Sequence, residues 1–211
     1  MAELVEAAYR IEVDRQAWLD GLAEVLGQIH GKGPGLMVYL FDASQREEGV
    51  HLPAYALYGL DETFAEATIK HNAASPPDDT RLVYGPGVRC STVSELLADQ
   101  GIVPAEHPSF GPNTRLIGIE DAWGLTASDA HSRGVAVAAP LNDVSQMSGE
   151  MRELWQLIGT HLLTAYRLRR RHVGGQDIDE AARDLIGASV DTAKELVKQE
   201  VLIRLRAHFS R

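Results

Sequence analysis

The alternation of hydrophobic and polar positions predicts a helix followed by two strands in the first 60 residues. Apolar residues recur at helical spacing within residues 11–30, and the glycine-rich residues 31–35 predict the end of that helix. The stripe of this helix consists of Trp18, Leu19, Leu22, Leu26 and Ile29. Residues 36–42 predict a strand that is buried on both faces, and residues 50–58 predict a second strand paired with it. Pro53 favours an edge position or a bulge for the second strand.

The middle of the chain is less regular. A helix is predicted to begin at Asp61, because acidic residues in a first turn suit the helix dipole. A loop over residues 75–79, a short strand over residues 80–84 and a short helix over residues 92–99 follow, within an irregular stretch that reaches residue 115. A long irregular stretch in a compact domain is usually functional or mobile.

Two strands and a long helix are predicted after this stretch. The strands cover residues 115–127 and 133–141, and Ser148 is expected to cap a helix over residues 149–171. The apolar stripe of this helix consists of Met151, Leu154, Trp155, Ile158, Leu162 and Ala165. Arginines 167, 169, 170 and 171 near its end suit a helix C-terminus.

The order of these elements predicts an α/β (α+β) fold with a mostly antiparallel sheet, flanking N- and C-terminal helices and a C-terminal helical tail. The first and last long helices are expected to pack together on one face of the sheet. We expect residues 1–173 to form one domain with a single hydrophobic core. Residues 174–211 are expected to form a linker and a tail with helices over 178–186 and 190–209.

Two stretches are similar to a known group of proteins. Residues 115–141 (RLIGIEDAWGLTASDAHSRGVAVAAPL) and 153–171 (ELWQLIGTHLLTAYRLRRR) resemble the GAF/PAS-like N-terminal sensor domain of LuxR-type helix-turn-helix regulators found in myxobacteria. The resemblance covers about residues 10–172 and implies small-molecule sensing in transcription regulation. It also implies a DNA-binding output module of about 60 residues, which residues 176–211 do not match. We therefore expect DNA contact only through a module that is not present in this chain.

Composition and charge narrow the classes of partner. The hydrophobic fraction is 45%, which is ordinary for a globular protein, and the net charge is −10. Residues 1–166 carry 10 basic and 23 acidic side chains, whereas residues 167–211 carry 10 basic and 7 acidic ones. Phosphate binding needs a basic surface, so the acidic body is not expected to bind nucleic acid. We find no stretch that predicts a membrane span or a secretory signal, and expect a cytoplasmic protein.

The sequence shows no catalytic or metal-binding motif, and we expect neither enzyme activity nor a cofactor. Cys90 is the only cysteine, which excludes an intrachain disulfide. A buried structural thiol is the favoured interpretation, with a thiol-dependent redox enzyme as an alternative. The eight histidines are not at the local spacings that bring two ligands to one metal ion.

Six residues are candidates for contact with a small ligand. Asp121 and Trp123 share one face of a predicted strand, so together they offer a carboxylate and an aromatic wall. The other four are Tyr55, His71, Cys90 and His107. A cavity of a few hundred Å³ between the sheet and residues 61–113 would favour sensing. A filled core would favour the alternative of a dimerisation or adaptor domain with a vestigial pocket.

A homodimer is expected because the second long helix is apolar over more than one stripe. Trp155 and Tyr166 widen the stripe beyond what one sheet face needs, and exposed apolar patches usually mark partners. The residues predicted at the interface are Trp18, Leu22, Leu26, Met151, Trp155, Ile158, Leu162 and Tyr166. The alternative is that Trp155 packs within one chain.

Overall fold

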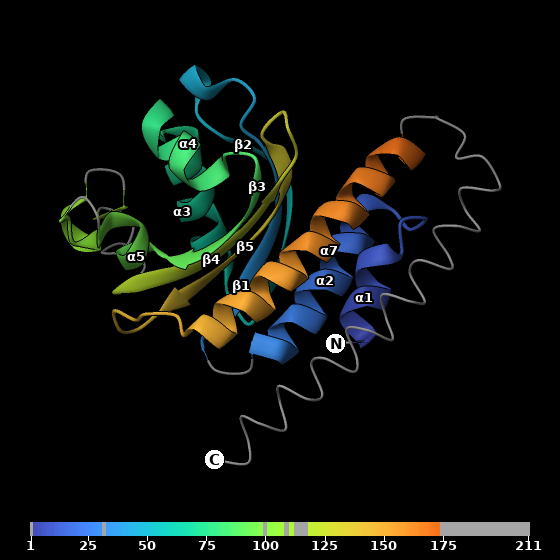
Figure 1. Ribbon diagram of the computed structural model, residues 1–211, viewed down its shortest axis with the longest axis horizontal. Coiled ribbons are helices and arrows are strands. Elements are labelled where there is room, and N and C mark those ends of the chain that lie inside the picture. Colours follow the sequence, from blue (N-terminus) through green and yellow to red (C-terminus); the bar gives the residue numbers. More distant parts are fainter. Residues whose placement is uncertain (1, 31–32, 99–100, 108–109, 112–117, 174–211) are drawn as a thin grey trace, which may run out of the picture.

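The protein folds around one five-stranded antiparallel sheet that lies between two layers of helices (Figure 1). The computed structural model describes residues 2–30, 33–98, 101–107, 110–111 and 118–173. The strands lie in the order β2-β1-β5-β4-β3. Their bounds are β1 Leu36–Asp42, β2 His51–Tyr58, β3 Gly87–Thr92, β4 Asp121–Ser128 and β5 Arg133–Leu141.

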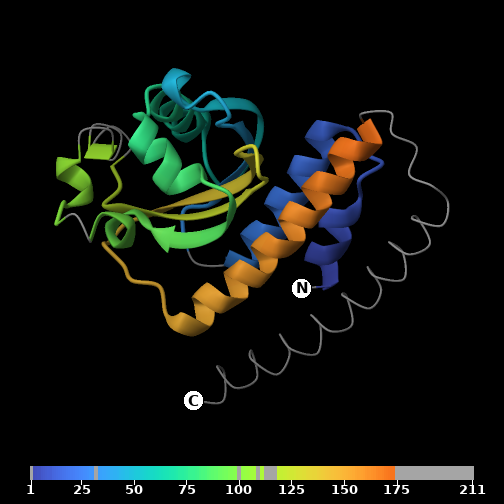
Figure 2. The ribbon, with the colours of Figure 1, turned by 45° about the horizontal axis from the view of Figure 1, so that its top comes forward.

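Two groups of helices cover the two faces of the sheet, as Figure 2 shows from a second side. On one face, α2 packs on β1 and β2, α7 packs on β3, β4 and β5, and α1 contacts both helices. The bounds of this group are α1 Ala2–Tyr9, α2 Arg15–His30 and α7 Gly149–Val173. The opposite face carries α3 Glu62–Ala73, α4 Pro77–Tyr84 and α5 Val93–Ala98, and short 3-10 turns occur at η1 Arg46–Glu48 and η2 Pro104–Glu106.

Each face of the sheet has its own hydrophobic core. Successive side chains of a strand point to opposite faces, so β1 supplies Leu36 and Val38 to the α2/α7 side and Met37, Tyr39 and Phe41 to the α3/α4 side. The strand is buried on both faces, as its continuous apolar run predicts. The expectation of a single core is wrong, because the sheet separates two apolar clusters.

Several predicted elements are confirmed together with the local chemistry that sets their ends. Strands β1 and β2 form the predicted antiparallel pair, and Pro53 lies on an edge strand of the sheet. The Asp61 carboxylate accepts a hydrogen bond from Thr63 N at 3.0 Å and caps α3. The Ser148 hydroxyl accepts one from Met151 N at 3.2 Å at the start of α7.

Other predicted elements are wrong in type or in their bounds, and two elements were not predicted. Residues 80–84 belong to helix α4 and not to a strand, because Pro77, Asp78 and Asp79 form a favourable first helical turn. The short strand β3 and the helix α1 were not predicted, and β4 starts at Asp121 instead of residue 115. The helices predicted over 178–186 and 190–209 lie outside the described residues.

The residues predicted at a dimer interface lie inside one chain. Seven of the eight are buried, and the indole of Trp155 lies 4.4 Å from that of Trp123 on the sheet. The buried seven are Trp18, Leu22, Leu26, Trp155, Ile158, Leu162 and Tyr166. Met151, with 42% of its surface exposed, is the exception. The interface prediction is therefore wrong for the seven buried residues, because the broad stripe of α7 packs against both the sheet and α1. The position of Met151 at an interface and the homodimer itself stay predictions.

Candidate ligand pocket

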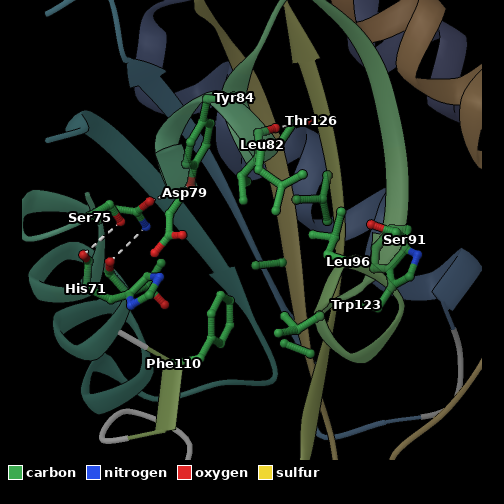
Figure 3. A pocket seen from close by; sticks show the side chains of 18 of the residues that line it. His71, Ser75, Asp79, Leu82, Tyr84, Ser91, Leu96, Phe110, Trp123 and Thr126 are labelled. Atoms are coloured by element: carbon green, nitrogen blue, oxygen red, sulfur yellow. Dashed lines mark hydrogen bonds between the residues drawn. The ribbon is translucent and has the colours of Figure 1, made fainter. Parts of the chain in front are cut away.

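A pocket lies between the sheet and the helices α3, α4 and α5 (Figure 3). Its volume is about 130 Å³. The side chains around it come from β1, β3, β4, β5 and the three helices. Those that set its shape are Phe64, Leu82, Val83, Leu96, Phe110, Ile119 and Trp123.

The pocket exists because the central strands present small residues to it. Ala122 and Gly124 of β4 and Ala138 of β5 line the sheet side, and Ala67 lies opposite them on α3. A β-carbon built on Gly124 would have no neighbouring atom closer than 3.9 Å. Protein cores are normally filled to the density of organic crystals. A run of small residues on facing elements therefore leaves space that larger side chains would occupy.

A chain of buried hydrogen bonds borders the pocket. The Tyr84 hydroxyl donates to Asn72 Oδ1 at 2.6 Å, so its only proton is used and it can only accept from Tyr39, whose hydroxyl lies 2.9 Å away. Asn72 in turn donates from Nδ2 to the Thr68 carbonyl. Burial raises the pKa of Tyr39 to about 12, and burial also raises that of Tyr84. Both phenols are therefore neutral at physiological pH.

The opposite end of the pocket from Leu96 and Trp123 is polar and aromatic. Figure 3 shows the Asp79 carboxylate pointing toward His71, with Phe110 beside them. The ring centroids of His71 and Phe110 are 4.6 Å apart. His107 Nε2 lies 3.7 Å from Asp79 Oδ1, and its side chain is almost fully buried. This end of the pocket therefore carries a carboxylate and imidazole rings, in contrast to the apolar walls.

Comparisons with known proteins identify the fold. No protein-family model matches the sequence, and no curated protein matches it. Among solved structures, the phycoerythrobilin-bound GAF domain of a cyanobacterial phytochrome is similar at a TM-score of 0.50 and 12% identity, covering 82% of this chain and 96% of that one. This chain has a GAF-like fold. The chromophore-binding domain of a bacteriophytochrome from R. palustris is similar at a TM-score of 0.50 and 10% identity, covering 81% of this chain. The match spans only 60% of that structure's own chain.

The GAF-like fold brings three of the six candidate ligand residues to the pocket region. His71 and Trp123 line the pocket, and His107 contacts the pocket residues Asp79 and Phe110. Tyr55 and Asp121 lie elsewhere and do not line it. The Tyr55 hydroxyl donates to Glu62 at 2.8 Å on the exposed side of β2, and the buried Asp121 carboxylate accepts from Ser94 N at the start of α5. The shared face of Asp121 and Trp123 therefore does not make a joint ligand contact.

Cys90 lies on the α2/α7 face of the GAF-like sheet, away from the pocket. Its sulfur accepts a hydrogen bond from Trp123 Nε1 at 3.3 Å and lies 3.5 Å from the Met147 sulfur. Burial raises the pKa of the thiol to about 11. A thiol is reactive only as the thiolate, so this environment does not support a nucleophilic role.

We predict that the folded protein reacts slowly with a thiol reagent. The raised pKa makes the thiolate roughly two orders of magnitude scarcer at pH 7 than in a free cysteine, and burial slows access further. The labelling rate, followed by absorbance, is expected to increase between pH 7 and pH 9 and to approach that of a free thiol only after unfolding in urea. Labelling of the native protein at the free-cysteine rate at pH 7 would contradict this environment.

Most residues that form the pocket were not predicted from the sequence. Phe64, Tyr84, Leu96 and Phe110 read as ordinary apolar positions, because nothing in their spacing separates a pocket wall from a filled core. A signal that could have located the pocket, but was not used, is the series of small residues in β4 and β5, in DAWGLTA and VAVAAP. The pairing of Gly124 with Ala138 places two of them side by side on the pocket face.

The described part of the chain shows neither a metal-binding cluster nor a membrane-spanning helix. No group of three His, Cys, Asp or Glu side chains there is close enough together to hold a metal ion. Within the same residues, no helix combines the length and the apolar character needed to cross a membrane.

Proposed function

We propose that this GAF-like domain is a small-molecule-sensing regulatory domain of a bacterial transcription regulator. A small ligand binds in the pocket between the sheet and α3–α5, favours one arrangement of the domain, and shifts the terminal helices. The observation that carries the proposal is the pocket itself, which combines apolar walls with a polar end in a domain of this fold. The domain acts by binding and not by catalysis.

The volume of the pocket limits the size of the ligand. Drug-sized ligands occupy pockets of about 300–1,000 Å³, whereas an apolar cavity of about 150 Å³ accepts benzene. At about 130 Å³, this pocket fits a molecule of roughly one ring. The ring would pack against Phe64, Leu96 and Phe110, and one polar substituent would face His71 and Asp79. A ligand as large as a bilin would need a much wider pocket.

The small volume also favours the second candidate function, a dimerisation or adaptor domain with a vestigial pocket. The volume lies below the few hundred Å³ expected for a sensor, but the space is not filled. The two candidates differ in one measurable respect, because only the sensor gains stability from a ligand.

A thermal-shift screen of ring-sized compounds tests the proposal. A ligand present at a hundred times its dissociation constant stabilises a protein by about 2.7 kcal/mol. For a domain of this size that corresponds to a rise in melting temperature of roughly 5–10 °C. We expect such a rise with at least one compound that has an apolar ring and one polar group. A broad screen in which no compound raises the melting temperature would favour the adaptor.

A further inference from the structure

Helix α5 has one side on the pocket and the other side on the connection to α7. Val93 and Leu96 line the pocket, whereas Glu95, between them in sequence, contacts the start of α7. The segment that leads from β5 into α7 passes beside α5 in both ribbon views (Figures 1 and 2). A change in the position of α5 would therefore reach the segment that precedes α7.

The Glu95 carboxylate joins three separate parts of the chain. Its Oε2 accepts from Thr92 N at 2.9 Å, and its Oε1 accepts from Met147 N at 2.9 Å and from Arg152 Nη2 at 2.8 Å. Arg152 also donates from Nη1 to the Cys90 carbonyl of β3 at 2.6 Å. Burial alone would raise the pKa of Glu95, but these hydrogen bonds and the guanidinium outweigh it and hold the pKa below its usual range. The carboxylate thus stays charged well below neutral pH.

Two more contacts fix α5 to the same connection. The Asp121 carboxylate accepts from Ser94 N at 3.1 Å and from Ser145 N at 3.4 Å. The Thr92 hydroxyl donates to the Ser145 carbonyl at 2.9 Å. Asp121 thus bridges the start of α5 and Ser145, and Thr92, which immediately precedes α5, bonds to Ser145 directly.

The far end of α7 is held by a different ion pair. Arg170 Nη1 lies 2.8 Å from Asp129 Oδ2 in the β4–β5 turn, and Asp129 Oδ1 accepts from the backbone of His131 and Arg133. None of these four residues lines the pocket. One end of α7 is thus connected to a pocket-lining helix and the other end to a turn outside the pocket.

We infer that the Glu95–Arg152 ion pair transmits occupancy of the pocket from α5 to the first turns of α7. This inference rests on the proposed sensing function and assigns its regulation to one contact. A side chain or ligand in the pocket displaces Val93 and Leu96. The hydrogen bonds of the Glu95 carboxylate carry that displacement to Met147 and Arg152. The Arg170–Asp129 pair, at the other end of α7, lies outside this path.

A competing route exists through aromatic rings. Trp123 lines the pocket, and its ring centroid lies 4.4 Å from that of Trp155 on α7. If this contact carried the displacement, removal of the ion pair would leave the response of α7 unchanged. The two routes therefore make opposite predictions for an Arg152 variant.

Hydrogen exchange in a set of variants tests the inference without any added ligand. Gly124→Ile fills the pocket from β4, and Ala67→Leu fills it from α3 as a second variant. Each is combined with Arg152→Met, which keeps the aliphatic part of the side chain and removes the charge, and with Arg170→Met as the matched control. Filling the pocket is expected to change the exchange rates of residues 149–156 by about fivefold or more in the wild-type and Arg170→Met backgrounds.

In the Arg152→Met background, the same filling is expected to change exchange in α5 but not in residues 149–156. Glu95→Gln, which keeps one acceptor oxygen and removes the charge that faces Arg152, should give the same loss if Arg152→Met folds poorly. An equal response of residues 149–156 in all backgrounds, or no response in the wild type, would overturn the inference. Failure of the proposed function is separate, because it would show as no stabilisation by compounds in any of these proteins.

Discussion

Replacing Trp155 with alanine is expected to lower the free energy of unfolding by about 3–5 kcal/mol. The Trp155 side chain has 2% of its surface exposed and lies in the core between α7 and the sheet. Its removal deletes the contact with the Trp123 ring and leaves a cavity that the surrounding strands cannot fill. Urea unfolding followed by circular dichroism measures the change.

Met151→Ala is the matched control for this variant, because Met151 is on the same helix but exposed. We expect it to change stability by less than about 0.5 kcal/mol. Light scattering of the two variants also tests the expectation that Trp155 lies at the interface of a homodimer. A Trp155→Ala protein of unchanged stability but lower mass would place Trp155 at a subunit interface and contradict its position in the core.

Gly124→Ile is expected to weaken ligand binding by at least about 100-fold, which corresponds to about 2.7 kcal/mol. The new side chain extends from the pocket face of β4 into a space of about 130 Å³ and competes directly with a ring-sized ligand. Stability is expected to stay equal or to rise, because isoleucine suits a strand and fills empty space, whereas glycine weakens a strand. Calorimetric titration with a compound found by the thermal-shift screen measures the affinity.

Gly21→Ala provides the control for this second variant. Gly21 is on α2, on the other side of the sheet, and a β-carbon there would meet no atom within 4 Å. It should raise helix stability by up to about 1 kcal/mol and leave ligand affinity unchanged. Binding by Gly124→Ile at the wild-type affinity would show that the ligand binds outside the pocket.

The elements that the sequence predicted well are those with a strong local signal. Residues 36–42 and 133–141 are continuous apolar runs, and both form central strands of the sheet over those residues. Asp61 and Ser148 accept hydrogen bonds from backbone N–H groups at the starts of their helices, as the preference for short polar side chains at helix starts predicts. The fold class followed from the order of these elements.

The errors arose where tertiary contacts decide the structure. Strand β3 carries Arg89 in its centre and is too short to show a pattern, so only its pairing with β4 identifies it as a strand. The breadth of the apolar stripe on α7 indicated a partner, but the partners are α1 and the sheet of the same chain. Sequence alone does not distinguish a second copy from a second layer of the same domain.

The candidate site was only partly predictable for a related reason. His71 and Trp123 were found because polar and aromatic groups suit ligand contact, and both line the pocket. Cys90 lies in the core on the α2/α7 face, where the Trp123 indole donates a hydrogen bond to it and packs on Trp155. Asp121 holds the start of α5. Which face a side chain occupies depends on strand register, and the boundary of β4 was predicted six residues too early.

A crystal structure of the protein with a compound from the thermal-shift screen tests the central claim most directly. The account predicts that the compound lies between the sheet and α3–α5, with its ring against Phe64 and Leu96 and its polar group toward His71 and Asp79. A compound located elsewhere, for example in the open groove beside Arg169 and Tyr166, would contradict the claim that this pocket is the ligand site.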